Sequence, residues 1–573
     1  MLGGGTRRAA GVLGIVFAVF AMAADAAAPK PAAAAIASAH PAATAAGQAI
    51  LDRGGNAFDA AVAVAAALAV AEPYSSGLGG GGFLLLHRAR DGKDVVIDAR
   101  EKAPRAAHRD MYLDDKGEFV PSRSLNGALA AAIPGLPAGL VHLSRHYGRL
   151  PLATALAPAI TLAEQGFTVT KHYHDLAGFR AAVLTADAEA ARIFLRDGAA
   201  PAIGTRIPQP DLATTLRRLA RAGQAGFYAG PVAAMLVAGV QAAGGIWTLE
   251  DLQAYRVVER APLVGTYHGI RVVSAPPPSS GGAVLLEALN ILEPYDVETR
   301  DAAARRHLVI EAMRRAYRDR AAYLGDPDFV RVPVARLIAK PHAAELARTI
   351  DSDKATPSSA LPALGTDAPQ GPQTTHFSIL DRDGNRVAAT LSINYPFGAA
   401  VVPPGSGVLL NDEMDDFSAR PATPNGYGLV GDEANAIAPG KRPLSSMTPT
   451  FLEAPDRVGI LGTPGGSRIV SMVLLGTLEF AAGKRPAEWV GAPRYHHQYL
   501  PDEVQFEPGA LDADAQADLV RRGHALKTVE RRYGNMQAIL WRFAGGAVDA
   551  ASDPRGEGEA KVWQQAHFER AAP

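Results

Sequence analysis

Thr374 lies at the boundary between a polar linker and a strand, where cleavage would turn its hydroxyl into the first side chain of a new chain end. The preceding residues, 352–373, are rich in Pro, Ser, Ala and Gly and show little apolar periodicity, which predicts a solvated, accessible segment. Downstream, Phe377 and Ile379 alternate with polar residues, and Asp383-Gly384 marks a turn before a second alternating run. The pattern predicts a β-hairpin that begins where the linker ends.

The expected hairpin register brings two hydroxyl groups together. If the turn is centred on Asp383, Ser392 lies opposite Thr374 and Thr390 lies opposite His376. Directly opposed residues have Cβ atoms roughly 4.5 to 5.5 Å apart, so the two hydroxyls would meet at the end of the linker. An ordinary hairpin also accounts for these residues, because threonine favours strands.

A chain end would solve the chemical weakness of a threonine nucleophile. A hydroxyl needs a base beside it, and an N-terminal residue carries one in its own α-amino group. That amine has a pKa of about 7.7 to 8.0, so a useful fraction is neutral at working pH. Exposing it requires cleavage of the Gln373–Thr374 bond. The same hydroxyl can attack the preceding carbonyl, form an ester and release the amine on hydrolysis.

Two glycine-rich segments have different interpretations. Residues 462–468, GTPGGSR, lie between an apolar strand at 458–461 and a predicted helix, so the backbone N–H groups of Gly465 and Gly466 are candidates for an oxyanion hole. A plain strand-to-helix connection would have the same sequence. Residues 77–82 satisfy the pattern G-x-G-x-x-G, but they follow a helix and enter a strand, the reverse of the dinucleotide-binding order.

Composition and the N-terminus indicate an exported protein that binds small molecules. The 57 basic and 58 acidic residues nearly cancel, which argues against a nucleic-acid or anionic-membrane partner. Arg7 and Arg8, an apolar run at 9–24 and the small residues at 24–26 predict a signal peptide over residues 1–26 and a periplasmic or secreted protein. No later segment predicts a membrane span. The chain has no cysteine, so it has no disulfide or thiolate site.

The mature chain is expected to be a layered α/β structure. Residues 43–53 predict a helix that Gly54-Gly55 ends, and Asn56 predicts the N-cap of a very apolar helix through Val70. Residues 127–350 are mainly helical by periodicity, and the part after the hairpin alternates short strands with turns. The linker divides the chain into a large piece, 27–373, and a small catalytic piece, 374–573.

Several long segments resemble one protein family in that family's order. The run TTHFSILDRDGNRVAATLSINYPFG at 374–398 resembles the signature of the γ-glutamyltranspeptidases, or glutathione hydrolases, within the N-terminal-nucleophile hydrolases. The other matching blocks are HPAATAAGQAILDRGGNAFDAAVAVAAAL, EPYSSGLGGGGF, DAREKAPRAAHRDMY, PPPSSGGAVLLEALNILE, NDEMDDFS, GDEANAIAPGKRPLSSMTPT, GTPGGSRI and APRYHHQ. The resemblance covers essentially the whole mature chain. It implies a four-layer αββα sandwich whose two subunits come from one precursor and form a heterodimer.

The resemblance also implies a role for each matching residue. Thr374 matches the nucleophile, Gly465 and Gly466 match the oxyanion-hole glycines, and Gln373–Thr374 matches the cleavage site. Arg100, helped by Ser445 and Ser446, matches the group that binds the substrate α-carboxylate. The residues that match acceptors of the α-ammonium group are Asn394, Glu413 and Asp416. Tyr427 matches a lid-loop tyrosine. His376 has no matching role and is interpreted as structural, and the adjacent His496 and His497 make a poor metal pair.

The resemblance implies transfer of a γ-glutamyl group from glutathione or a related amide, through Thr374, to water or to an amino acid or peptide acceptor. It implies no metal or organic cofactor. One departure concerns Ser392, which stands where most of the family has Thr. Serine keeps the hydroxyl but loses the methyl group that restricts its rotamer, so the rate of processing is open. Two alternatives remain: a glutaryl or cephalosporin-type acylase on the same scaffold, and an unprocessed binding protein.

Overall fold

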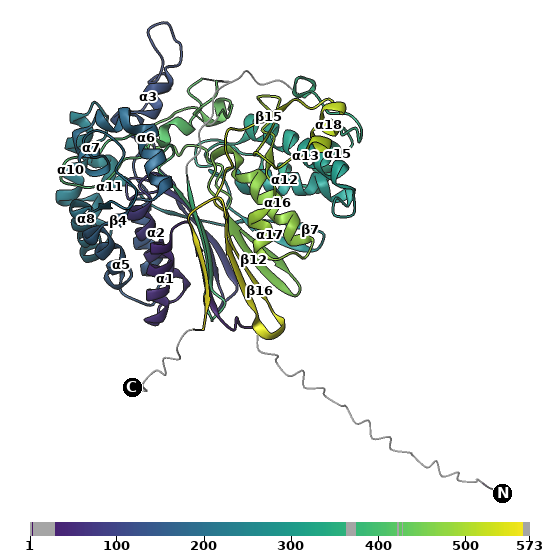
Figure 1. The fold of residues 1–573 in the computed structure, drawn as a ribbon, viewed down its shortest axis with the longest axis horizontal. Coiled ribbons are helices and arrows are strands. Elements are labelled where there is room, and N and C mark those ends of the chain that lie inside the picture. Colours follow the sequence, from purple (N-terminus) through teal and green to yellow (C-terminus); the bar gives the residue numbers. More distant parts are fainter. Residues whose placement is uncertain (1–2, 4–28, 362–373, 421–422, 427, 565–573) are drawn as a thin grey trace.

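The computed structural model describes residues 3, 29–361, 374–420, 423–426 and 428–564. Two β-sheets pack face to face in the middle of the molecule, and a layer of helices covers the outer face of each (Figure 1). This confirms the predicted four-layer αββα sandwich. Gln373, Tyr427 and the predicted signal peptide, apart from residue 3, lie outside the described residues.

The first sheet has seven antiparallel strands with the predicted hairpin in its middle. Its strands, in spatial order, are β18 (Glu559–Trp563), β1 (Ala34–Ser38), β9 (Thr375–Leu380), β10 (Arg386–Ser392), β2 (Gly81–Arg88), β3 (Lys93–Ala99) and β6 (Val258–Arg260). The order of the second sheet is β17 (Val548–Ser552), β16 (Gln537–Arg542), β12 (Arg457–Gly462), β11 (Thr450–Ala454), β8 (Ile270–Ser274) and β7 (Leu263–Tyr267). Both sheets combine strands from before and after residues 362–373.

Three apolar layers hold these sheets and helices together. Between the sheets, residues such as Phe83, Phe451 and Ile460 form a buried cluster. The outer face of the first sheet packs against helices of the first 260 residues, namely α1 (Pro41–Asp52), α2 (Ala57–Ala71), α4 (Leu136–Tyr147), α5 (Leu152–Gln165), α8 (Pro210–Ala222), α9 (Ala225–Tyr228), α10 (Gly230–Ala242) and α11 (Leu249–Ala254). Removal of this much apolar surface from water is the main force that stabilises the layers.

The outer face of the second sheet packs against a separate set of helices, which lie on the opposite side of the molecule in Figure 1. These are α12 (Gly281–Leu292), α13 (Ala302–Tyr323), α14 (Val334–Leu337), α15 (Lys340–Ala347), α16 (Ile469–Ala481), α17 (Pro486–Gly491) and α18 (Ala513–Arg521). The remaining α-helices and β-strands of the described ranges are α3 (Pro121–Leu125), α6 (Lys171–Thr185), α7 (Ala188–Phe194), β4 (Phe167–Thr168), β5 (Arg206–Ile207), β13 (Tyr495–His496), β14 (Val504–Phe506) and β15 (Leu526–Thr528). None of the helices in the described ranges has the length and apolar character that a membrane crossing requires.

Helix α2 shows how the sequence determines this packing. All of its residues are buried, as its almost uniformly apolar sequence predicts. Asn56 caps its N-terminus by accepting from the backbone of Phe58 and Asp59, and Asp59 accepts in return from the Asn56 backbone. The prediction of a helix from Asn56 to Val70 is therefore confirmed, and the helix ends one residue later.

The hairpin of β9 and β10 has the predicted register. Thr390 pairs with His376 and Leu391 pairs with Thr375, so Ser392 is the next residue across from Thr374. The turn is held by the Asp381 carboxylate, which accepts from the backbone N–H groups of Asp383 and Asn385. The hairpin thereby fixes where Thr374 stands, in the middle of the first sheet.

The glycine-rich run at 77–82 is explained by close packing between strands. A Cβ atom on Gly80 would lie 2.1 Å from the carbonyl oxygen of Ser392, and one on Gly79 would lie 2.0 Å from that of Leu409. Only glycine allows the chain to enter β2 this close to the end of β10. These glycines therefore allow the backbone of residues 79 and 80 to pack directly against Leu409 and Ser392.

Candidate active site

Thr374 lies where two hollows meet. Its residue is 5% exposed and precedes β9. On one side is a small polar cavity lined by Arg100, Thr374, Ser392, Asn394, Glu413, Asp416, Leu429, Ser445, Ser446, Met447, Gly466 and Ile469. On the other side is a cleft of about 630 Å³, which Thr374 shares with Gly465, Glu72 and a basic segment at 527–532. The fold thus gathers in one cavity nearly all the described residues that the sequence predicted for the site.

The end of β10 supplies Ser392 and Asn394 to the small cavity. The Ser392 hydroxyl accepts a hydrogen bond from the Asn394 backbone N–H at 2.7 Å. Asn394 has a φ of 72°, a left-handed conformation that asparagine tolerates better than most residues. Its side-chain amide nitrogen donates to the carbonyl oxygen of Asp412 at 3.0 Å. Ser392 therefore supports the position of Asn394 as well as facing Thr374.

Arg100 is the central charged residue of this cavity. It directly follows β3 and is almost fully buried. Its guanidinium group donates to Glu413 Oε2 at 2.6 Å and to Asp416 Oδ2 at 2.5 Å. Burial alone would lower the pKa of Arg100, but the carboxylates of Glu413, Glu101 and Asp416 raise it well above its usual value. Arg100 is therefore a permanent cation held by acids that come from a short 3₁₀ helix, Glu413–Asp416.

The cavity contains more acid than base. Glu101, which was not predicted as a site residue, lies 3.4 Å from Arg100. Three carboxyl groups thus surround one guanidinium group. Burial raises the pKa of Glu101 to about 7 and raises the pKa of Glu413 well above its usual value. Glu413 Oε1 is buried and accepts no hydrogen bond from the described residues. The arrangement therefore favours a second cation at this place.

Ser445 and Ser446 lie on a loop that other residues hold rigidly. The backbone N–H of Ser445 donates to Pro278 O at 2.9 Å, and the Ser280 hydroxyl donates to Ser445 O at 2.7 Å. The Ser446 hydroxyl accepts from the Arg320 guanidinium group at 3.3 Å. The PPPSSGG segment therefore braces the loop that brings both serines to the cavity.

Gly465 and Gly466 each line one of the two hollows that Thr374 also lines. Gly466 lines the small cavity and begins a 3₁₀ helix, Gly466–Arg468, that leads into α16, while Gly465 lines the cleft. Both have positive φ, 144° and 55°. A Cβ atom on Gly465 would lie 2.5 Å from Met472 Cε, the flexible end of a side chain that can move, so it is the positive φ that favours glycine at this position.

A comparison with known families identifies the chain. The family model of γ-glutamyltranspeptidase matches residues 43–563. The chain belongs to the γ-glutamyltranspeptidase family. A glutathione hydrolase proenzyme from Escherichia coli is 43% identical over 528 residues, which cover 91% of this chain and 90% of that protein. Membership makes the chain a self-processing γ-glutamyl transferase and hydrolase with the N-terminal-nucleophile fold.

Solved structures of this family and of acylases share the fold. The γ-glutamyltranspeptidase of Helicobacter pylori is 41% identical and has a TM-score of 0.55; the alignment covers 56% of this chain and 93% of that one. A cephalosporin acylase from Bacillus halodurans is 30% identical and has a TM-score of 0.82, with 94% and 97% coverage. One scaffold thus supports both activities, so the fold alone does not explain γ-glutamyl transfer, and its physical basis must lie in the side chains of the site.

Glu72 lines the cleft of this γ-glutamyltranspeptidase-family site but was not among the residues predicted from the sequence. It follows α2, lines the cleft with Thr374 and accepts from the Thr375 hydroxyl at 2.7 Å and the Tyr74 hydroxyl at 3.3 Å. Burial raises its pKa to about 7. The available signal was an acidic residue placed directly after a helix that is apolar except for Asp59.

The three histidines singled out from the sequence, His376, His496 and His497, do not line the small cavity of this γ-glutamyltranspeptidase-family site. His376 hydrogen-bonds Thr390 at 2.8 Å on the face of the hairpin between the sheets, and burial lowers its pKa to about 3. It is therefore neutral at working pH. His496 contacts Ser471 and His497 contacts Asp502, so the adjacent pair points to different partners, as predicted.

Proposed function

We propose that the chain cleaves itself at Gln373–Thr374 and that Thr374 then acts as the nucleophile. The position of Thr374 at the start of β9, next to Ser392 and Gly466, supports this role. In turnover, Thr374 Oγ attacks the amide carbon, its proton passes to the Thr374 α-amine, and the α-amine returns a proton to the leaving amine. Water then attacks the ester in the same way, or an amino acid or peptide amine replaces water.

The backbone N–H groups of Gly465 and Gly466 would stabilise the oxyanion that forms in each step. The acyl group would occupy the small cavity, and the leaving amine and the incoming acceptor would occupy the cleft. Thr374 lines both the small cavity and the cleft, so the two sides of the scissile bond can lie in different hollows. Arg100, the proposed partner of the donor carboxylate, lines the small cavity. The basic N-terminal segment with its apolar run supports export of the protein to the periplasm or beyond.

The acid-rich surroundings of Arg100 carry the proposal that the donor is a γ-glutamyl amide such as glutathione. A γ-glutamyl group ends in a zwitterion, with a carboxylate and an ammonium group on one carbon. Its carboxylate would pair with Arg100, and its ammonium group would pair with Glu413, Asp416 and Asn394. Each protein ion pair is exchanged for a pair with the ligand, so no charge is left alone.

A glutaryl group fits the same cavity poorly. It brings a carboxylate and no ammonium group, so it would take Arg100 from Glu413 and Asp416 and leave those acids buried without a cation. Removal of one partner from a buried hydrogen-bonded charge pair typically costs ~2 to 5 kcal/mol. The charge balance of the cavity therefore favours a γ-glutamyl transferase and hydrolase over the acylase alternative.

The test compares two anilides that share a leaving group and differ only in the α-amino group, γ-glutamyl and glutaryl p-nitroanilide. We expect kcat/KM for the γ-glutamyl anilide to exceed that for the glutaryl anilide by roughly 30-fold or more, the lower end of that cost. Asp416→Asn should reduce activity on the γ-glutamyl anilide and narrow the ratio.

Asp415→Asn is the matched control because Asp415 is buried in the same 3₁₀ helix but accepts from Ser124 and Gly426 rather than Arg100. It should leave the ratio unchanged. Equal turnover of both anilides by the wild-type protein would favour the acylase activity and reject this proposal.

A further inference from the structure

Three helices on the outer face of the second sheet bring two carboxylates and an imidazole together, away from the cavity of Thr374. Glu287 comes from α12, Asp319 from α13 and His342 from α15. His342 Nε2 lies 2.9 Å from Asp319 Oδ2 and 3.6 Å from Glu287 Oε1. The three ligand atoms all lie within 4.8 Å of one another.

Glu287 is incompletely satisfied in this cluster. Its residue is 1% exposed, and its Oε1 atom accepts no hydrogen bond from the described part of the chain. Two arginines lie near the cluster: Arg318 donates to Asp319, and Arg336 lies over the ring of Tyr323. A buried acid oxygen that faces a carboxylate and an imidazole is a position where a cation would be stabilised.

The spacing agrees with that of metal ligands. Zinc binds histidine nitrogen at about 2.0 to 2.1 Å and carboxylate oxygen at about 2.0 to 2.2 Å, so ligands in a tetrahedron lie about 3.4 Å apart. The two measured distances from His342 fall on either side of that value. Asp319 Oδ1 also accepts from Arg318 at 2.7 Å, the kind of outer contact that orients a ligating carboxylate. His342, at 14% side-chain exposure, gives the cluster a route to solvent.

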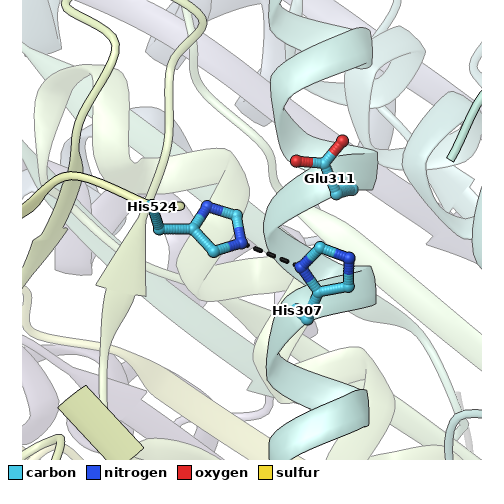
Figure 2. A group of neighbouring side chains, drawn as sticks. All are labelled: His307, Glu311 and His524. Atoms are coloured by element: carbon cyan, nitrogen blue, oxygen red, sulfur yellow. Dashed lines mark hydrogen bonds between the residues drawn. The ribbon is translucent and has the colours of Figure 1, made fainter. Parts of the chain in front are cut away.

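A second cluster, formed by His307 and Glu311 of α13 and by His524 just after α18, has similar residue types but a different electrostatic setting (Figure 2). There His307 Nδ1 and His524 Nε2 hydrogen-bond each other at 2.8 Å. Glu311 accepts from the guanidinium groups of Arg314 and Arg315 and from the Thr356 backbone N–H. Both oxygens of Glu311 are thus occupied by donors that include two guanidinium groups, which would repel a metal ion. In the first cluster Arg318 donates to Asp319, but Glu287 Oε1 accepts from none of the described residues.

We propose that Glu287, Asp319 and His342 bind one divalent transition-metal ion, with zinc as the best match to a mixed nitrogen and oxygen ligand set. The ion would tie α15 to α12 and α13 and so stabilise the helical layer over the second sheet. This site is separate from the catalytic cavity and takes no part in the reaction at Thr374.

The experiment measures zinc binding to the full, processed protein after treatment with a chelator. Competition with a chromophoric zinc chelator and metal analysis of the dialysed protein give affinity and stoichiometry. We expect wild-type protein to bind one more equivalent of zinc than Glu287→Gln and to melt at a higher temperature with zinc than without it. Glu287→Gln and His342→Gln should each weaken zinc binding at least ~10- to 100-fold, the loss known for changes to outer-shell partners alone.

His524→Gln is the matched control because it removes a histidine from the cluster in Figure 2. It should retain the zinc equivalent. Glu287→Gln keeps the size and shape of the side chain but removes its negative charge and one acceptor oxygen, so a loss of zinc in this variant reflects the missing ligand rather than a change in packing. The proposal is overturned if wild-type protein binds no zinc, if Glu287→Gln and His342→Gln bind it as tightly as wild type, or if only His524→Gln loses it.

Discussion

Replacement of Ser392 by alanine tests how the hairpin prepares Thr374 for reaction. Ser392 is the next cross-strand residue after the Leu391–Thr375 pair, and it lines the same cavity as Thr374. Its hydroxyl also accepts from the backbone N–H of Asn394, which is 2% exposed. Ser392→Ala therefore removes a group that can orient the nucleophile and leaves a buried donor without this acceptor.

The expected magnitude follows from these two losses. An ordinary hydrogen bond contributes ~0.5 to 1.5 kcal/mol, and a buried donor left unsatisfied costs ~1 to 3 kcal/mol. A range of ~0.5 to 3 kcal/mol corresponds to rates roughly 2- to 150-fold lower. We expect both self-cleavage and steady-state turnover to slow within this range.

The assays are the disappearance of the precursor on a denaturing gel and the steady-state rate on a γ-glutamyl anilide. A loss confined to KM would indicate that Ser392 acts mainly by placing Asn394, whereas a lower kcat with slower processing indicates action on Thr374. Ser392→Thr keeps the hydroxyl and adds a methyl group that restricts its rotamer, so it should process at least as fast as wild type. Unchanged rates for Ser392→Ala in both assays would refute the role given to this hydroxyl.

Two further predictions concern processing and pH. Thr374→Ala should remain a single chain, whereas the mature wild type should give two fragments of about 36 and 21 kDa, as obtained by scaling the total mass to residue number. N-terminal sequencing of the smaller fragment should read Thr-Thr-His-Phe-Ser. An intact wild-type chain with full activity would contradict the mechanism. Because burial raises the pKa of Glu72 from 4.5 to about 7, its contribution to stability is fully present below pH 4.5 and is lost as pH rises towards 7. Glu72→Gln should therefore gain about 3 kcal/mol relative to wild type between pH 4.5 and pH 8, measured as a difference in unfolding free energy or melting temperature at each pH; a difference that does not change with pH would show that Glu72 has an ordinary pKa.

The parts of the fold that local patterns specify were predictable from the sequence. The uniformly apolar run after Asn56 forms the buried helix α2, and the alternation around Asp383-Gly384 forms the hairpin with its expected register. The strands β6, β7 and β8 were missed because they are short and lie within a long segment whose overall periodicity is helical. Two of them pair with strands that are distant in the chain, β6 with β3 and β8 with β11, whereas β7 pairs with its neighbour β8.

Some features of the candidate site were likewise predictable from the sequence, and others were not. Residue types suited to a zwitterionic ligand were recognisable, and Arg100, Glu413 and Asp416 do share one cavity. Their direct pairing was not predictable, because the arginine and the acids are more than 300 residues apart in the chain. The participation of Glu101 was also missed. In a strand, neighbouring side chains point to opposite faces, so Glu101 would be expected to point away from Arg100. Strand β3 ends at Ala99, however, and the rule does not apply to the two residues that follow it.

Because each sheet contains strands from both sides of the proposed cleavage point, folding and unfolding of the enzyme should differ. Both proposed pieces supply strands to each sheet: in the first sheet β9 and β10 lie between β1 and β2, and in the second β8 pairs with β11. The first sheet cannot be completed by either piece alone, so assembly depends on a continuous chain that holds all the strands at high effective concentration. Cleavage then removes the covalent link between the two pieces after the sheet has folded. The mature enzyme is therefore expected to be protected by a slow rate of unfolding, and once unfolded it should not regain activity on cooling.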